Sequence, residues 1–143
     1  MIIKRLAMYN FGVYAGENTF EFSLDKPVVL IGGMNGRGKT TFLEAILLSL
    51  YGSNSNAYKE SGASTYGQYL RNHINKSSWD RRAYVEMTFV QNENIHTEYT
   101  IHREWDAHSK RTTESIDVKE NGVCNEFLTQ NWNLFIENIV PYA

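Results

Sequence analysis

The chain has 143 residues, an apolar fraction of 42% and a formal net charge of −2 at pH 7. This length predicts a single domain over residues 1–143, and the slight negative charge excludes a basic field spread over the whole chain. The single cysteine, Cys124, excludes an internal disulfide. Neither a signal peptide nor an apolar run of membrane length is present, so we expect a cytoplasmic protein with no membrane partner.

The N-terminal part of the chain reads as three successive strands. Residues 3–9 are strand-like and run into a turn at residues 10–12. Residues 19–24 alternate polar and apolar side chains, which predicts a half-buried antiparallel strand. Residues 27–32 are continuously apolar apart from their ends, as expected for a strand covered on both faces.

The next segment, residues 33–40, reads Gly-Met-Asn-Gly-Arg-Gly-Lys-Thr and matches the Walker A pattern G-x-x-x-x-G-K-[ST]. Glycines let backbone N–H groups approach a phosphate chain closely, and Lys39 is placed to reach the β- and γ-phosphates. The Thr40 hydroxyl is the predicted Mg²⁺ ligand. The segment therefore predicts a site for ATP and Mg²⁺. The predicted contact residues are Gly33, Asn35, Gly36, Arg37, Gly38, Lys39, Thr40 and Thr41.

A helix is predicted directly after this motif, as a phosphate-binding loop requires. Gly52 stands where a helix would end. A glycine-rich turn that only joins a strand to a helix is the alternative interpretation, and the order strand, loop, helix disfavours it. The apolar positions at helical spacing are Leu43, Ile46, Leu47 and Leu50.

The following segments are a loop, a short helix and two hairpins. Residues 53–65 are polar and rich in turn formers, which predicts a long surface loop before a short helix near residues 66–71. Residues 82–90 and 95–105 predict the first hairpin. The Asn121-Gly122 pair is a strong signal for the second. On one face of the second strand we expect Tyr99, Ile101, Arg103 and Trp105.

An apolar stripe at helical spacing follows near the C-terminus and is stopped by Pro141. We interpret it as a packing face rather than a cofactor site. Its members are Phe127, Leu128, Trp132, Phe135, Ile136 and Ile139.

Other residues that could bind DNA, bases or a metal are better explained by structural roles. Trp79, Trp105 and Trp132 are predicted to be core or interface anchors rather than base-stacking platforms. Arg81 and Arg82, beside Trp79, are predicted to be surface charge rather than contacts to a DNA backbone. His96 and His102 share a strand face, and neighbouring glutamates favour a solvated face over a metal site.

Several parts of a complete nucleotide hydrolase are missing from the sequence. No apolar run ends in the acidic residues of a Walker B strand, which would complete Mg²⁺ coordination. The segment at residues 60–64 only loosely echoes an LSGGQ signature, and the N-K-x-D base-recognition motif is absent. We therefore predict no catalytic residue within this chain.

The order of these motifs resembles the N-terminal lobe of SMC and SbcC-type ABC ATPases. More narrowly, residues 29–46 with Leu50-Tyr51-Gly52, residues 69–75 and the terminal segment at residues 132–141 resemble the DndD family. DndD proteins are the SMC/SbcC-like ATPases of bacterial DNA phosphorothioation, also called DNA sulfur modification. The implied fold is an α/β P-loop NTPase lobe with antiparallel β hairpins packed beside the Walker A strand-loop-helix.

The resemblance implies an ATPase that works as a full-length dimer, so this chain alone is expected to be inactive. The implied partners are its own C-terminal lobe, a second copy of the head, other DNA sulfur-modification proteins, and DNA through the full-length protein. It also implies that Asn10 and Phe11 lie at the nucleoside end of the site and that Arg71 reaches the phosphates. The alternatives are a head lobe of an SbcC- or RecF-like DNA-repair ATPase and a small P-loop kinase.

Overall fold

The computed structural model describes residues 1–22 and 37–139, and residues 37–39 are described as helical backbone only. The predicted strand at residues 27–32, the first part of the Walker A loop at residues 33–36 and Pro141 lie outside the described residues.

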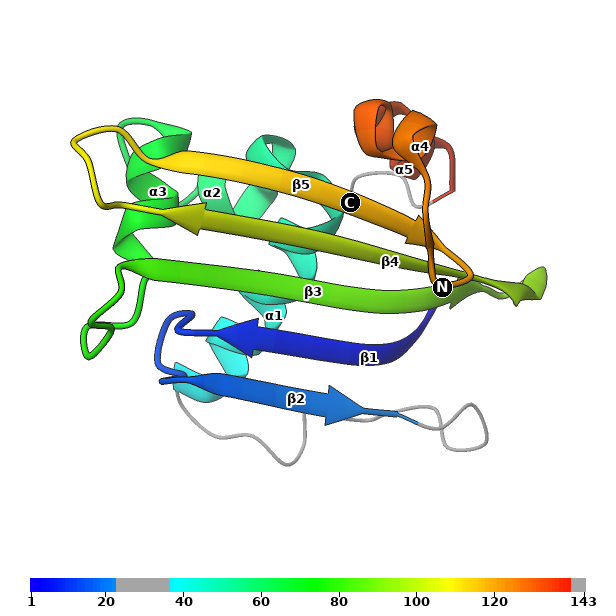
Figure 1. Cartoon of the computed structure of the whole chain (residues 1–143), viewed down its shortest axis with the longest axis horizontal. Helices are drawn as coiled ribbons and strands as arrows, with labels where there is room; N and C mark the ends of the chain where they lie inside the picture. Colours follow the sequence, from blue (N-terminus) through cyan, green and yellow to red (C-terminus); the bar gives the residue numbers. More distant parts are fainter. Residues whose placement is uncertain (23–36, 140–143) are drawn as a thin grey trace.

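The described strands form one antiparallel sheet in the order β2-β1-β3-β4-β5-β6 (Figure 1). The first two strands pair with each other, and β1 also pairs with β3, which is far away in the sequence. From β3 onward each strand pairs with the next, so the two predicted hairpins are parts of one continuous meander. The strands are β1 (Ile2–Tyr9), β2 (Glu17–Glu21), β3 (Arg82–Gln91), β4 (Asn94–Asp106), β5 (Thr113–Glu120) and β6 (Val123–Cys124).

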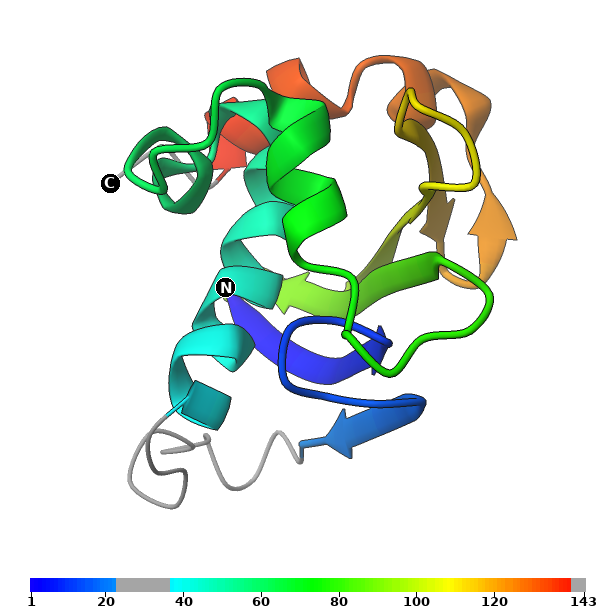
Figure 2. The ribbon, with the colours of Figure 1, turned by 90° about the vertical axis from the view of Figure 1, so that its left-hand side faces the viewer.

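The described helices lie against one face of this sheet, which leaves the other face open to solvent (Figures 1 and 2). The longest helix, α1, crosses behind the central strands, and α3 lies beside it. None of the described helices is long and apolar enough to cross a membrane. The helices are α1 (Arg37–Tyr51), the 3₁₀ turn η2 (Gly52–Asn54), α2 (Asn56–Lys59), α3 (Tyr66–Asn72), α4 (Glu126–Gln130) and α5 (Trp132–Ile139).

The core lies between α1 and the inward face of the sheet. Leu6, Met87 and Ile101 are fully buried members of neighbouring strands, and they belong to the same apolar cluster as Phe42 and Leu48 of α1. Because strand side chains alternate, many outward positions of the same strands are polar, such as Arg5, Glu86 and His102. The four apolar positions noted in the sequence do not all face this core: Leu50 is buried, Ile46 and Leu47 pack against the core half-buried, and Leu43 is exposed. The buried positions of α1 are Thr41, Phe42, Ala45, Leu48, Ser49, Leu50 and Tyr51.

Apolar side chains lie around most of the circumference of α1, so its sequence alone does not decide which of them face the core. The sheet therefore selects the face, and it selects the one that carries Phe42 and Ala45. Leu43 is left exposed, and Ile46 and Leu47 are half-buried.

Two turn predictions are confirmed by backbone geometry. Asn121 and Gly122 both have positive φ (51° and 82°), as a two-residue type I′ hairpin requires. Gly52 has φ 54° directly after the last residue of α1, where a side chain would be strained.

The predicted loop at residues 53–65 was wrong in part, because it contains η2 and the short helix α2. Ser55 is fully buried, and its Oγ accepts a hydrogen bond from the Tyr58 N–H. This N-cap organises a turn that composition alone describes as irregular. The short helix predicted near residues 66–71 is confirmed as α3.

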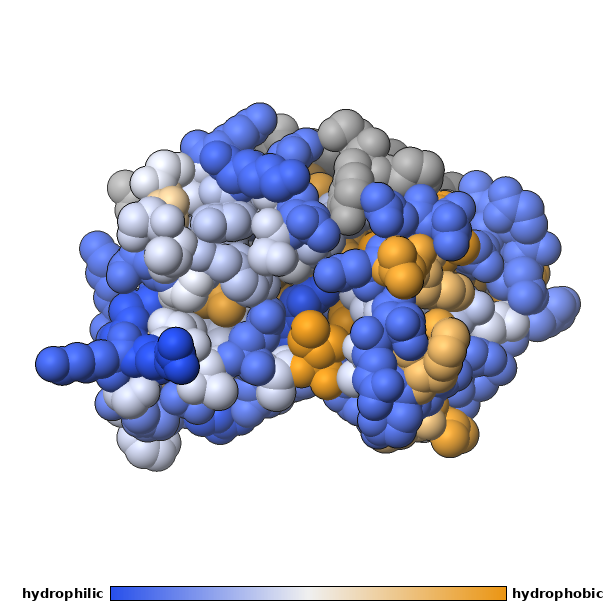
Figure 3. Space-filling model, turned by 90° about the horizontal axis from the view of Figure 1, so that it is seen from above, coloured by the Kyte–Doolittle hydropathy of each residue, from blue (hydrophilic) through white to orange (hydrophobic). Residues whose placement is uncertain are grey.

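The C-terminal stripe is confirmed as helical but is only partly a packing face. Leu128, Trp132 and Ile136 are buried, whereas Phe127 is 73% exposed. Seen from above, hydrophobic side chains gather at the end of the molecule that carries α4 (Figure 3). Trp105 and Trp132 are core residues as predicted. Trp79 is 88% exposed, so it is not a core anchor, and its alternative role as an interface anchor stays a prediction.

Candidate nucleotide site

The described part of the Walker A motif is the beginning of α1. The helix begins at Arg37, so Gly38, Lys39 and Thr40 lie in its first turn, where the backbone N–H groups have no partner within the helix. Thr40 is exposed, and Thr41 is buried. An exposed threonine in the first turn of a helix fits the role of a Mg²⁺ ligand beside a phosphate chain. Gly33, Asn35 and Gly36 lie outside the described residues.

The turn after β1 lies directly against this first helical turn. Gly12 has φ 57°, and a Cβ built on it would lie 2.6 Å from Cγ2 of Thr41. That distance is shorter than any normal contact, so the chain passes Thr41 at a place where only glycine fits. The structure therefore brings residues 10–12 beside the residue that follows Thr40.

The side chain of Asn10 holds this turn together. It is 5% exposed, and Asn10 adopts φ 50°. Its Oδ1 accepts a hydrogen bond from the Gly16 N–H at 2.8 Å, while its Nδ2 lies 3.3 Å from Ser78 Oγ, Asp80 Oδ1 and the Arg82 carbonyl. Its polar atoms are therefore engaged within the lobe.

Phe11 is fully buried, with its ring 5.4 Å from that of His73 and 5.8 Å from that of Trp105. The structure thus places Asn10 and Phe11 as supports of the turn beside Thr41. Their contact with a nucleoside stays a prediction.

The segment after α3 is joined to the same turn. The Gly12 N–H donates to the His73 carbonyl at 2.7 Å, and the Asn75 N–H donates to the Asn10 carbonyl at 2.7 Å. Asn75 Nδ2 also donates to the Gly12 carbonyl at 2.8 Å. Residues 73–75 and 10–12 therefore form one unit that rests on α1.

A half-buried ion pair joins the C-cap residue of α3 to α1. His73 Nε2 lies 2.6 Å from Glu44 Oε2, and His73 Nδ1 lies 2.8 Å from the Tyr69 carbonyl. The Tyr69 hydroxyl donates to the same Glu44 oxygen at 3.1 Å. The sequence does not indicate this trio, because its members are separated by up to 29 residues and match no motif.

Interactions within the trio favour the charged forms of His73 and Glu44. Burial lowers the pKa of His73, but the hydrogen bonds to Glu44 and to the Tyr69 carbonyl, with the charge of Glu44, raise this pKa above its ordinary value. Burial likewise raises the pKa of Glu44, while the bond to His73 and its positive charge lower it overall. Near neutral pH both shifts favour a charged pair.

Arg71 forms hydrogen bonds with a loop of the sheet. Its Nη2 donates to the Ser109 carbonyl at 2.6 Å, and its Nη1 lies 3.5 Å from the Ala107 carbonyl. Both acceptors belong to the loop between β4 and β5. A contact between Arg71 and nucleotide phosphates stays a prediction.

The other end of α1 is fixed by a buried cation. Arg103 of β4 is 2% exposed, and its Nε donates to the Ser49 carbonyl at 3.1 Å. Its Nη1 lies 3.7 Å from Glu114 Oε2. A positive charge at the C-terminal end of a helix is favourable. The predicted strand alternation placed Arg103 on this inward face, and the structure confirms it.

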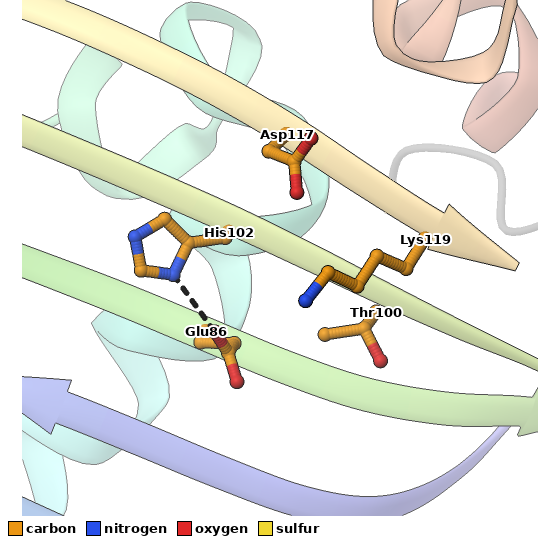
Figure 4. A pocket seen from close by; sticks show the side chains of 5 residues that line it. All are labelled: Glu86, Thr100, His102, Asp117 and Lys119. Atoms are coloured by element: carbon orange, nitrogen blue, oxygen red, sulfur yellow. Dashed lines mark hydrogen bonds and ion pairs between the residues drawn. The ribbon is translucent and has the colours of Figure 1, made fainter. Parts of the chain in front are cut away.

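The open face of the sheet carries a shallow pocket of about 240 Å³ (Figure 4). His102 lies between two carboxylates, with Nδ1 at 2.8 Å from Glu86 Oε2 and Nε2 at 3.1 Å from Glu104 Oε1. The hydrogen bond to Glu86 is the main cause of the raised pKa of His102. Within residues 1–22 and 37–139, no group of three or more His, Cys, Asp or Glu residues could hold a metal ion. The residues that line the pocket are Glu86, Thr100, His102, Asp117 and Lys119.

Comparisons with known proteins agree on the type of fold. The SMC head domain from Thermotoga maritima superimposes with a TM-score of 0.50 at 19% identity, and the match covers 99% of this chain and 46% of that one. At this identity the likeness shows the fold, an α/β P-loop lobe of the ABC/SMC type.

Two curated proteins are similar in sequence. The DNA double-strand break repair Rad50 ATPase of Methanocaldococcus jannaschii is 28% identical over 148 residues, which covers 97% of this chain. The SbcC component of the nuclease SbcCD from Treponema pallidum is 42% identical over 48 residues, or 34% of this chain. The chain spans only 13% and 5% of the lengths of these relatives. The model of the AAA domain family matches residues 5–140, nearly the whole chain. The chain therefore belongs to the AAA domain family.

Proposed function

We propose that this chain is the ATP-binding N-terminal lobe of an SMC-like ATPase. The observation that carries the proposal is the first turn of α1, which has the Walker A sequence and is braced by the 10–12 turn through the Gly12–Thr41 contact. A braced helix N-terminus is a preorganised anion site, because its N–H groups need not move when phosphate binds.

Each residue of the motif has a proposed part in this site. Lys39 supplies positive charge to the β- and γ-phosphates, and the hydroxyl of Thr40 is a ligand of Mg²⁺. Glycines 33, 36 and 38 let the backbone come close, and Asn35, Arg37 and Thr41 complete the loop and its junction with the helix. The turn formed by Asn10 and Phe11 bounds the nucleoside end, and Arg71 is an additional candidate contact to phosphate.

Hydrolysis is proposed to need more than this chain. No carboxylate in a Walker B context is present in the sequence, and the chain spans a small part of its relatives. We propose that a C-terminal lobe supplies the acids that complete Mg²⁺ coordination and that a second head closes the site.

Two cellular roles fit such a head. The Rad50 and SbcC relatives favour DNA repair. The match of residues 29–46 and 132–141 to the DndD pattern favours DNA sulfur modification, together with other proteins of that system. Deletion of the gene in its host separates these roles. Loss of phosphorothioate linkages from genomic DNA, measured by mass spectrometry of digests, supports sulfur modification, whereas sensitivity to double-strand breaks with linkages unchanged supports repair.

ATP binding itself is tested by calorimetry with Mg²⁺-ATP. Lys39→Ala removes the charge that faces the phosphates, and we expect it to weaken binding by at least about tenfold. Lys59→Ala, in the last turn of α2, is the matched control and should bind as wild type does. Equal affinity of the Lys39→Ala variant and the wild type would refute the site.

A further inference from the structure

Two loops leave the same end of the sheet, on the left of Figure 1, and extend in different directions from it (Figures 1 and 2). Residues 75–81 lead into β3, and residues 107–112 join β4 to β5. The Ala107 N–H donates to the Arg81 carbonyl at 2.9 Å, which joins the two loops at their bases. Arg71 fastens the second loop to α3 through the Ser109 carbonyl. We call these two segments together the tip loops.

The tip loops are basic, although the chain as a whole is slightly acidic. Their four Lys and Arg residues are all exposed: Lys76, Arg81, Lys110 and Arg111. The one acidic residue within them, Asp80, is turned inward, with a side chain only 11% exposed. Its oxygens accept hydrogen bonds from the Tyr9 hydroxyl at 2.5 Å and the Ser78 hydroxyl at 2.9 Å. The loops therefore present positive charge to solvent and keep their acid within the fold. Asp106, which ends β4 and directly precedes the second loop, is half-buried.

Trp79 lies in the first of the tip loops, between the exposed residues Lys76 and Arg81 in the sequence. It is 88% exposed, more than any other large apolar side chain of the described residues. Its loop is nevertheless ordered by bonds on both sides of the indole, since Ser78 and Asp80 both contact Asn10. Arg81 adopts φ 53°, a conformation that is uncommon for residues other than glycine. The fold thus keeps the large aromatic ring of Trp79 exposed to solvent.

An exposed aromatic ring that shares its loop with two exposed cations, with a second basic loop at the same end of the sheet, matches one class of ligand. Aromatic side chains stack on unpaired bases, and Lys and Arg side chains bind the phosphates that link them. We propose that the tip loops bind a single-stranded nucleic acid, with a base stacked on Trp79 and phosphates held by Lys76, Arg81, Lys110 and Arg111. An apolar protein partner fits less well, because the neighbours of Trp79 in the loop are Ser78 and Asp80 and the other exposed side chains of the tip loops are polar or charged. This binding does not depend on the ATP site.

The stacking part is tested with a fluorescein-labelled oligothymidylate by anisotropy, without nucleotide and at low salt. Trp79→Ala is expected to weaken binding about tenfold, whereas Trp79→Phe keeps most of the affinity because a stacking ring remains. Phe127→Ala is the matched control, since Phe127 is 73% exposed on α4 at the opposite end of the sheet (Figure 1). This control should bind as wild type does.

The phosphate part is tested by the salt dependence of the same binding. The double variant Lys110→Ala/Arg111→Ala should reduce the slope of log affinity against log salt by about 1.4, or about 0.7 for each phosphate that is no longer neutralised. Lys119→Ala, which removes an exposed charge from β5, should leave the slope unchanged.

Several results would overturn the proposal. One is equal affinity of wild type and Trp79→Ala; another is tighter binding of a duplex that is insensitive to Trp79. A change in self-association on Trp79→Ala, seen by sedimentation, with oligonucleotide binding intact would assign the surface to a second copy of the chain. Weaker ATP binding with oligonucleotide binding intact would assign Trp79 to the nucleotide. In contrast, Lys39→Ala should leave nucleotide-free oligonucleotide binding unchanged, so the two proposals fail separately.

Discussion

Substitution of Gly12 by alanine tests whether the 10–12 turn braces the nucleotide site. Gly12 has φ 57° and would place a Cβ 2.6 Å from Cγ2 of Thr41. The positive φ costs alanine about 1 to 2 kcal/mol. The collision adds about 1 to 3 kcal/mol of overpacking, because Thr41 is β-branched and only 6% exposed, so it has little room to turn. We therefore expect a loss of roughly 2 to 5 kcal/mol in the free energy of unfolding.

Gly16, which lies in the same connection between β1 and β2, provides a matched control. Gly16 has φ 65°, yet nothing lies within 4 Å of a Cβ built on it. Gly16→Ala should therefore lose only the backbone part, about 1 to 2 kcal/mol. Urea unfolding followed by far-UV circular dichroism measures both values. The collision is relieved partly by displacing Thr41, next to Thr40, so the Gly12→Ala variant should also bind Mg²⁺-ATP about tenfold more weakly if about 1.4 kcal/mol of strain reaches the site. Equal losses of stability in the two variants would refute the bracing contact.

Three further predictions follow from individual contacts. The raised pKa of His73 means that its contribution to stability is present below pH 6.5 and is lost as pH rises through the higher folded-state pKa. The stability advantage of wild type over His73→Gln should therefore shrink as pH rises above 6.5, and a pH-independent difference would contradict the ion pair with Glu44. Ser55→Ala removes the N-cap of α2 and should cost about 1 kcal/mol in urea unfolding, against no measurable cost for exposed Ser115→Ala; an unchanged midpoint would show that the cap is unimportant. Purified residues 1–143 should release phosphate from ATP at a negligible rate, with Lys39→Ala as the control for contamination; turnover that depends on Lys39 would instead point to a catalytic carboxylate within the chain and to a self-sufficient P-loop enzyme.

The sequence by itself predicted the elements whose signals are local. Period-two alternation predicted β2, β3 and β4, and it also placed Arg103 on the same face as Trp105. Asn121-Gly122 predicted the hairpin, because positive φ at two successive residues selects these residue types. The Walker A pattern predicted a helix opening near Lys39, and α1 begins there.

The tertiary structure alone decided which surfaces meet. An apolar residue can face either the sheet or solvent, so the burial of Phe42 rather than Leu43 depended on how α1 lies across the strands. The pairing of Glu44 with His73 and the approach of Gly12 to Thr41 join segments that are about 30 residues apart in each case. No local backbone preference encodes such distant contacts. The exposure of Trp79 arises in the same way, because hydrogen bonds from Asn10 to Ser78 and Asp80 hold its loop outside the core.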